Sequence, residues 1–131
     1  MISEKKLEKT IELARAYNAE ECKYSTFSLD KMQEMMENVK KIKPYRDALE
    51  SHLNSLSYDD ILDLEGLMDY GRDLDLKFVD IFAKKNFEER RDFFAKNYPS
   101  PNGKEEAGRY LVGKGPLAEY LERAAKALEL L

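Results

Sequence analysis

The stretch SYDDILDLEGLMDYG, residues 57–71, combines a helix-start signal with a complete apolar stripe. Ser57 stands three residues before Asp60 in a capping-box pattern, in which side-chain oxygens accept hydrogen bonds from free N–H groups of the first turn. Apolar residues then recur at the spacing of one helical face, and Gly71 is a common residue type at a helix end. The stretch therefore predicts a helix that enters a core through Ile61, Leu64, Leu67 and Met68.

Upstream of this stretch, the apolar spacing predicts three more helices. The first begins after Ser3 as N-cap, and a connection over residues 18–27 follows it. The second begins at Ser28 and the third at Pro44, where the missing N–H costs nothing in a first turn. The residues expected to face inward are Leu7, Ile11, Ala14 and Tyr17, then Leu29, Met32, Met36 and Val39, then Tyr45, Leu49, Leu53 and Leu56.

Downstream, Asp73 or Asp75 is expected to cap a helix that runs through Phe78, Val79, Ile81 and Phe82. A further helix restarts or bends at Asn86. The proline- and glycine-rich run at 98–103 is the strongest break and marks a sub-boundary. Helices over 104–112 and 116–130 then close the chain. The sequence predicts an all-α single domain over residues 1–131, with six or seven short helices ending in an antiparallel helical hairpin.

Composition and charge restrict the function classes. The 131 residues carry a formal net charge of −4, and the excess lies between residues 57 and 102, where eleven acids stand against seven bases. No basic face follows from this pattern, so we expect no nucleic-acid partner. We also expect no membrane partner, because no stretch reaches the roughly 18 apolar residues of a membrane span. One cysteine and no visible signal peptide favour a cytoplasmic location.

Two stretches partly match known ligand-binding motifs, a phosphate-binding loop and a calcium-binding loop, but neither predicts a binding site. GRYLVGKG, residues 108–115, is one residue short of a phosphate-binding loop, but Gly115 replaces the hydroxyl residue and a helix-like segment replaces the required strand. We interpret it as a corner between two helices, with Pro116 opening the second. The acidic run from Asp69 to Asp80 lacks the central glycine and the final glutamate of a calcium loop. We expect no cofactor and no metal.

Two catalytic arrangements remain as alternatives. Cys22 and His52 form a nucleophile–base pair only if the fold joins them, and we expect His52 on the surface instead. Glu34 and Glu37, with Asp60 and Asp63, place two acids one turn apart on each of two helices. They are similar to the E-x-x-E…E-x-x-D pattern of all-α nucleotide pyrophosphatases. Facing helices of this kind hold magnesium for phosphate hydrolysis, although so acidic a chain offers such pairs by chance.

Three segments, residues 14–18, 56–73 and 110–121, together resemble a bacterial domain-of-unknown-function family. Its members carry AR-x-F-D, then L-x-x-D-E-x-x-x-L-x-A-L-x-W-x-G-R-G-D, then Y-L-L-G-x-P-L-L-x-D-Y-L. Here the second glycine and the tryptophan of the middle motif are missing. The resemblance implies a compact helical domain of bacterial origin and transfers no activity. The polar motif positions that it singles out as a candidate surface are Arg15, Arg72, Asp73, Tyr110 and Tyr120.

An aromatic-rich middle segment completes the candidates. It contains Phe78, Phe82, Phe87, Phe93 and Phe94, and most of these side chains are expected in the core. An apolar remainder favours a second copy of the chain or a partner helix. The leading hypothesis is therefore a non-enzymatic interaction or regulatory domain that binds a protein partner or forms a homo-oligomer. The alternative is the magnesium-dependent nucleotide or phosphate hydrolase.

Overall fold

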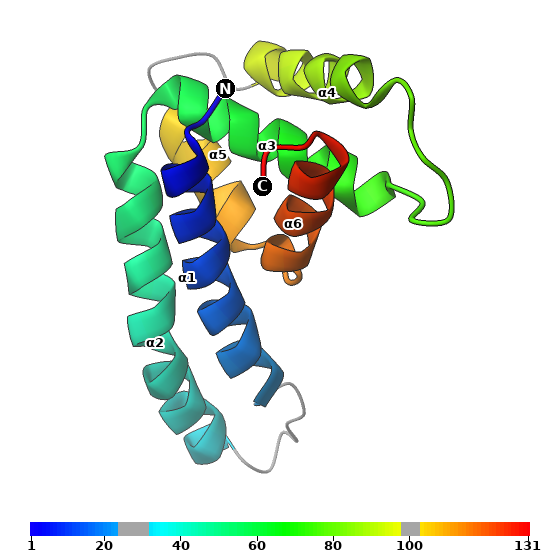
Figure 1. Ribbon diagram of the computed structural model, residues 1–131. Helices are drawn as coiled ribbons and strands as arrows, with labels where there is room; N and C mark the ends of the chain where they lie inside the picture. Colours follow the sequence, from blue (N-terminus) through cyan, green and yellow to red (C-terminus); the bar gives the residue numbers. More distant parts are fainter. Residues whose placement is uncertain (24–31, 98–102) are drawn as a thin grey trace.

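A computed structural model describes residues 1–23, 32–97 and 103–131, and these form an all-α domain (Figure 1). The expected fold class is confirmed. The expected helix start at Ser28 and most of the 98–103 break lie outside the described residues. The described helices are α1 (Glu4–Lys23), α2 (Met32–Ser55), α3 (Tyr58–Asp73), α4 (Ala83–Asn97), α5 (Gly103–Val112) and α6 (Leu117–Ala127).

Helix α3 is the centre of the domain. It contacts α4, α5 and α6, and every residue from Ile61 to Met68 is buried. Its start follows the expected chemistry, because the Ser57 hydroxyl oxygen accepts a hydrogen bond from the Asp60 N–H at 3.1 Å. Burial all around this helix exceeds the one-sided stripe that the sequence predicts, since three helices pack on it.

Helices α1 and α2 lie side by side as a long pair, and α1 also packs against α6 (Figure 1). The Lys6 N–H donates to the Ser3 hydroxyl at 3.3 Å, which confirms Ser3 as the cap of α1. The prediction of a connection from Asn18 is wrong, because α1 continues to Lys23. The prediction of a helix start at Pro44 is also wrong, because Pro44 lies inside α2.

The inward stripe predicted for α2 is only half correct. Leu49 and Leu53 are buried, whereas Met36 and Val39 are each 59% exposed. The first half of α2 has few neighbours to cover it, since within the described residues this helix packs mainly against α1 and α5. Apolar spacing predicts which face of a helix is apolar, but tertiary packing decides whether anything covers that face.

Gly71 does not end α3, and the predicted stop there is wrong. The helix passes through Gly71 to Asp73, and α6 crosses at this glycine. A Cβ atom placed on Gly71 would lie 1.9 Å from the backbone oxygen of Tyr120. The glycine is therefore required by the close approach of two helices, and its φ is not positive.

The segment between α3 and α4, residues 74–82, is not the predicted helix. Asp75 Oδ1 accepts from the Lys77 N–H at 2.9 Å, and Asp80 Oδ1 accepts from the Phe82 N–H at 2.9 Å. Aspartate side chains that bond the backbone two residues ahead compete with helical bonding. Helix α4 consequently begins only at Ala83.

The corner over residues 113–116 confirms the interpretation of GRYLVGKG as a helix junction. Helix α5 ends at Val112, and the Gly113 N–H donates to the Arg109 carbonyl at 3.1 Å. Pro116 is the N-cap of α6 and Leu117 its first residue. Within this corner, the Nζ of Lys114 lies 4.3 Å from the centre of the Tyr110 ring, in a cation–π contact.

The one described non-glycine residue with positive φ lies just beyond the end of α6. Glu129 has φ 56°, and the next N–H, of Leu130, donates to the Ala125 carbonyl at 2.8 Å. This is a Schellman ending, whose left-handed position normally holds glycine.

Replacing Glu129 by glycine is expected to raise the free energy of unfolding by about 0.5–1 kcal/mol, because glycine adopts this conformation without the steric penalty of Cβ. Urea unfolding of Glu129→Gly checks this. Glu129→Ala is the matched control, since it removes the same carboxylate and keeps the Cβ. Equal stability of the two variants would show that the left-handed position carries no strain.

Candidate functional site

Residues 74–82, here called the apolar loop, expose large side chains to solvent. Val79 is 90% exposed and Ile81 is 82% exposed. Folded domains rarely leave such residues adjacent to one another without a use for them. The exposed apolar members of the loop are Leu76, Phe78, Val79, Ile81 and Phe82.

A charged network holds the first end of the apolar loop. Arg90 of α4 places Nη1 2.8 Å from Asp69 Oδ2 and 2.8 Å from Asp73 Oδ2. Arg72 pairs with the Oδ1 atoms of both aspartates. The hydrogen bond from Arg90, followed by the charges of both arginines, lowers the pKa of Asp73. The network therefore fixes the point at which the chain leaves α3.

Asp80 holds the second end of the apolar loop. Its Oδ2 accepts from the Tyr70 hydroxyl at 2.8 Å and from Asn86 Nδ2 at 2.9 Å. The hydrogen bond from Asn86, followed by those from Tyr70 and from the Phe82 N–H, lowers the pKa of Asp80. Burial, and then the bond to Asp80, raises the pKa of Tyr70 to about 12, so the tyrosine remains a donor at neutral pH.

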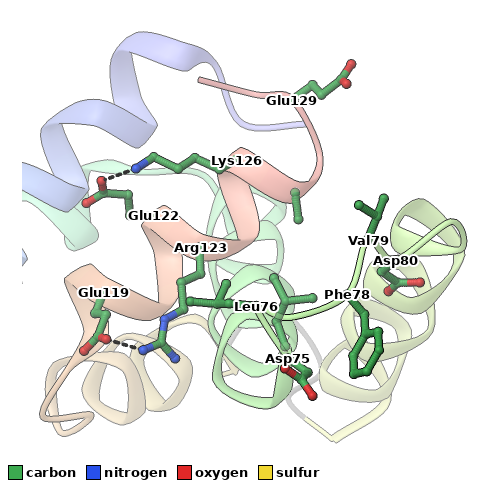
Figure 2. A pocket seen from close by; sticks show the side chains of 12 residues that line it. Asp75, Leu76, Phe78, Val79, Asp80, Glu119, Glu122, Arg123, Lys126 and Glu129 are labelled. Carbon is green, nitrogen blue, oxygen red and sulfur yellow. Dashed lines mark hydrogen bonds and ion pairs between the residues drawn. The ribbon is translucent and has the colours of Figure 1, made fainter.

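The apolar loop and α6 enclose a groove of about 600 Å³, shown in Figure 2. Leu76 and Phe78 line the loop side, and Arg123 lies across from them on α6. Arg123 is paired with Glu119, and Lys126 lies 2.9 Å from Glu122. The groove thus has one wall formed by the loop, with apolar side chains beside Asp75 and Asp80, and a second, charged wall formed by α6.

The structure gathers four of the five motif residues around the start of the apolar loop. Arg72 and Asp73 belong to the network with Arg90, and the backbone of Tyr120 lies against Gly71. Burial alone would lower the pKa of Arg72, but the Asp69 and Asp73 carboxylates and a hydrogen bond with Tyr110 raise it above its usual value. These residues position the loop and do not form its exposed surface.

Arg15 lies apart from the other motif residues. It forms an ion pair with Glu122 that joins α1 to α6. Both residues line a second hollow, of about 900 Å³, between α1 and the Pro116 corner. Beside them, Asn18 Oδ1 accepts from the Ala118 N–H at 3.3 Å and so caps the start of α6. Arg15 and Asn18 therefore have structural roles in docking α1 onto α6.

The four carboxylates of the hydrolase alternative do not converge. Glu34 and Glu37 are exposed near the start of α2, whereas Asp60 and Asp63 follow its end, and at about 1.5 Å per residue the intervening helix separates them by more than about 25 Å. Asp63 instead accepts from the Ile2 N–H at 2.7 Å and from Arg91 Nε at 2.6 Å. The residues that the structure describes contain no cluster of three His, Cys, Asp or Glu side chains able to hold a metal ion.

Cys22 and His52 also lie apart. His52 Nε2 is 2.8 Å from the Thr10 hydroxyl, whose own proton goes to the Lys6 carbonyl at 2.8 Å, so the ring nitrogen is the donor. Thr10 and Cys22 are twelve residues apart along α1, which is about 18 Å at about 1.5 Å per residue. His52 is half-buried, contrary to the prediction of a surface histidine, and burial lowers its pKa. Its role is to join α2 to α1.

Glu65 is a buried acid that the sequence did not single out. Its side chain on α3 is fully buried, and neither carboxyl oxygen has a hydrogen-bond partner among the described residues. Burial, and then the charge of Asp69, raises the pKa of Glu65 to about 8, against a smaller opposing effect of Lys114. The group is therefore protonated at neutral pH. Position 65 lies among apolar neighbours in the central helix, and that is the only signal that could have found it.

Comparison with known proteins does not assign the chain to a family. No protein-family model, curated protein or solved structure matches the chain. The family resemblance of the three motifs stays a prediction. Within the described part of the chain, no helix combines the length and the apolar character needed to cross a membrane.

Proposed function

We propose that this protein is a non-enzymatic interaction or regulatory domain that binds a protein partner through the apolar loop. One observation carries the proposal: five large apolar side chains are exposed on a segment whose two ends are held by polar contacts. The cytoplasmic location and the resemblance to the bacterial family belong to the same proposal.

The physical argument concerns the cost of binding. Aromatic and aliphatic side chains supply most of the energy when they enter a partner's pocket. Binding also costs free energy for ordering side chains and loops, and preorganisation reduces that cost. The contacts of Asp73 and Asp80 order the ends of the loop before any partner arrives. A role in ordering the loop for binding would explain why polar contacts lie at both ends of an exposed apolar segment.

The test is site-specific photo-crosslinking in the cells that make the protein. A photoreactive phenylalanine analogue replaces Val79 in the apolar loop or, as the matched control, Val39 on the outer face of α2. We expect a discrete adduct with a partner protein from position 79 and little from position 39, because position 79 belongs to an anchored apolar segment and position 39 does not.

Two results would count against this function. Absence of any adduct from position 79 would show that no partner protein contacts the apolar loop. Equal yields from positions 79 and 39 would show that contact reflects exposure alone. A partner identified by mass spectrometry is then tested against Phe78→Ser/Ile81→Ser, which is expected to lose binding while keeping the circular dichroism spectrum of the unaltered chain.

A further inference from the structure

The groove beside the apolar loop is lined by more carboxylates than basic side chains. Its lining contains two bases, Arg123 and Lys126, and each is already paired with a glutamate of α6. Three further carboxylates line the groove and form no ion pair among the described residues: Asp75, Asp80 and Glu129. The groove therefore attracts a cationic group to its rim.

The interior of the groove suits apolar side chains. Leu74, Leu76 and Val79 line it from the loop, and Ala127 lines it from α6. A volume of about 600 Å³ is within the range of pockets that enclose small ligands or protruding side chains. An apolar interior with an acidic rim complements one face of an amphipathic helix whose flanks carry lysine or arginine.

A second copy of this chain fits the groove poorly. A two-fold contact of loop on loop would bring two identical acidic rims together, and like charges at an interface oppose association. Among the described residues, another pair of exposed apolar side chains lies on α2, where Met36 and Val39 stand beside Lys40. Two apolar side chains do not match the five that the loop exposes, so the charges and the size of the surface both favour a different protein.

We propose that the groove between the apolar loop and α6 binds a basic amphipathic helix of a partner protein. The apolar face of that helix covers Leu76, Phe78 and Val79, and its basic flanks meet Asp75 and Glu129. This inference rests on the proposed function, because it names the partner's chemistry for the same surface.

The experiment uses the full chain, labelled with ¹⁵N, and two synthetic peptides of about 14 residues, long enough for a marginally stable helix. Both carry leucine at helical i, i+3, i+4 and i+7 spacing. One has lysine at the remaining positions, and the other has glutamate. We expect the lysine peptide to shift the amide resonances of residues 74–80 and 117–129, and to bind at least about tenfold more tightly than the glutamate peptide at low ionic strength.

Matched charge variants separate the groove from general attraction. Asp75→Asn/Glu129→Gln removes two rim charges, and asparagine keeps the oxygen that accepts from the Lys77 N–H. Glu8→Gln/Glu12→Gln removes two charges from the exposed face of α1. We expect at least about a fivefold loss of affinity for the lysine peptide in the rim variant and less than about a twofold loss in the α1 variant, since screened charges act over about 10 Å.

The inference is overturned if the two peptides bind alike, if both charge variants weaken binding equally, or if the shifts fall outside the groove. It is also overturned if the unaltered chain fills the groove by self-association, seen as a concentration-dependent mass in sedimentation. A discrete adduct from a photoreactive residue at position 79 together with any of these results would support partner binding through the loop and would contradict the basic helix as the bound element. Absence of that adduct would instead contradict the proposed binding of a partner protein through the loop.

Discussion

Replacing Gly71 by alanine is expected to lower the free energy of unfolding by about 3 kcal/mol or more, at the upper end of the cost of overpacking a core. The new Cβ would stand 1.9 Å from the Tyr120 carbonyl oxygen and 2.7 Å from its carbon, and neither backbone atom can turn aside. Helices α3 and α6 would have to separate, which would loosen the packing of the buried residues that both helices contribute to the core.

Gly108 offers the matched control for this substitution. It also lies inside a helix, α5, but a Cβ placed there would meet no atom within 4 Å. Gly108→Ala is expected to stabilise the protein by about 0.5–1 kcal/mol, because alanine has the higher helix propensity. Chemical denaturation of both variants gives the comparison. Equal effects of the two substitutions would contradict the close crossing of α3 and α6 at Gly71.

Stability is expected to fall as the pH rises through the range in which Glu65 titrates. The pKa of this carboxyl is about 8 in the folded protein, against 4.5 for a glutamate exposed to water, as in the unfolded chain. Between these values the folded state retains a proton that the unfolded state releases. The contribution is fully present below pH 4.5 and declines by about 1 kcal/mol per pH unit up to pH 8, or several kcal/mol in all.

Two variants isolate this contribution from the other titrating groups. Glu65→Leu removes both the charge and the unpartnered polar atoms, so it is expected to be increasingly more stable than the unaltered protein as the pH rises. Glu65→Gln is expected to remove the same pH dependence while keeping buried polar atoms without partners. The measurement is the difference in unfolding free energy from urea titrations between pH 4.5 and 8. A difference that stays constant with pH for both variants would contradict a buried, protonated Glu65.

Much of the fold follows from local signals in the sequence. Ser57 with its apolar stripe predicts α3, and the corner at residues 113–116 predicts the break between α5 and α6. These signals are local, because a cap and a periodic face act within a single helix. The predicted helix start at Pro44 and the predicted stop at Gly71 were wrong, because α2 runs through Pro44 and because the close approach of α6 requires a glycine inside α3.

The apolar loop could not be predicted from spacing. Phe78, Val79, Ile81 and Phe82 fit one face of a helix, and periodicity does not show whether a neighbouring element exists to cover that face. The aspartates at positions 75 and 80 were a usable signal, because an aspartate side chain that accepts a hydrogen bond from the N–H two residues ahead favours a turn. Both aspartates accept such a bond in the structure. The network around Arg90 depends on contacts between α3 and α4 that the sequence does not specify.

The acidic candidates show the same limit. Glu34, Glu37, Asp60 and Asp63 have the right spacing within each helix, yet α2 runs unbroken between the two pairs and keeps them apart. The acidic bias of residues 57–102 was visible in the sequence. Of the acids in that stretch, only Asp75 and Asp80 line the groove, and Glu129, beyond the end of α6, joins them from a distant part of the chain.

Partner binding through the apolar loop is decided by the yield of adduct from a photoreactive residue at Val79, relative to that at Val39. We predict a discrete adduct from position 79 at a yield at least about fivefold above that from position 39, because an anchored apolar surface is what a partner covers. We also predict that Phe78→Ser/Ile81→Ser abolishes this adduct in a chain that remains folded. A yield ratio near one, or an adduct that survives the double substitution, would contradict a partner-binding role of the loop.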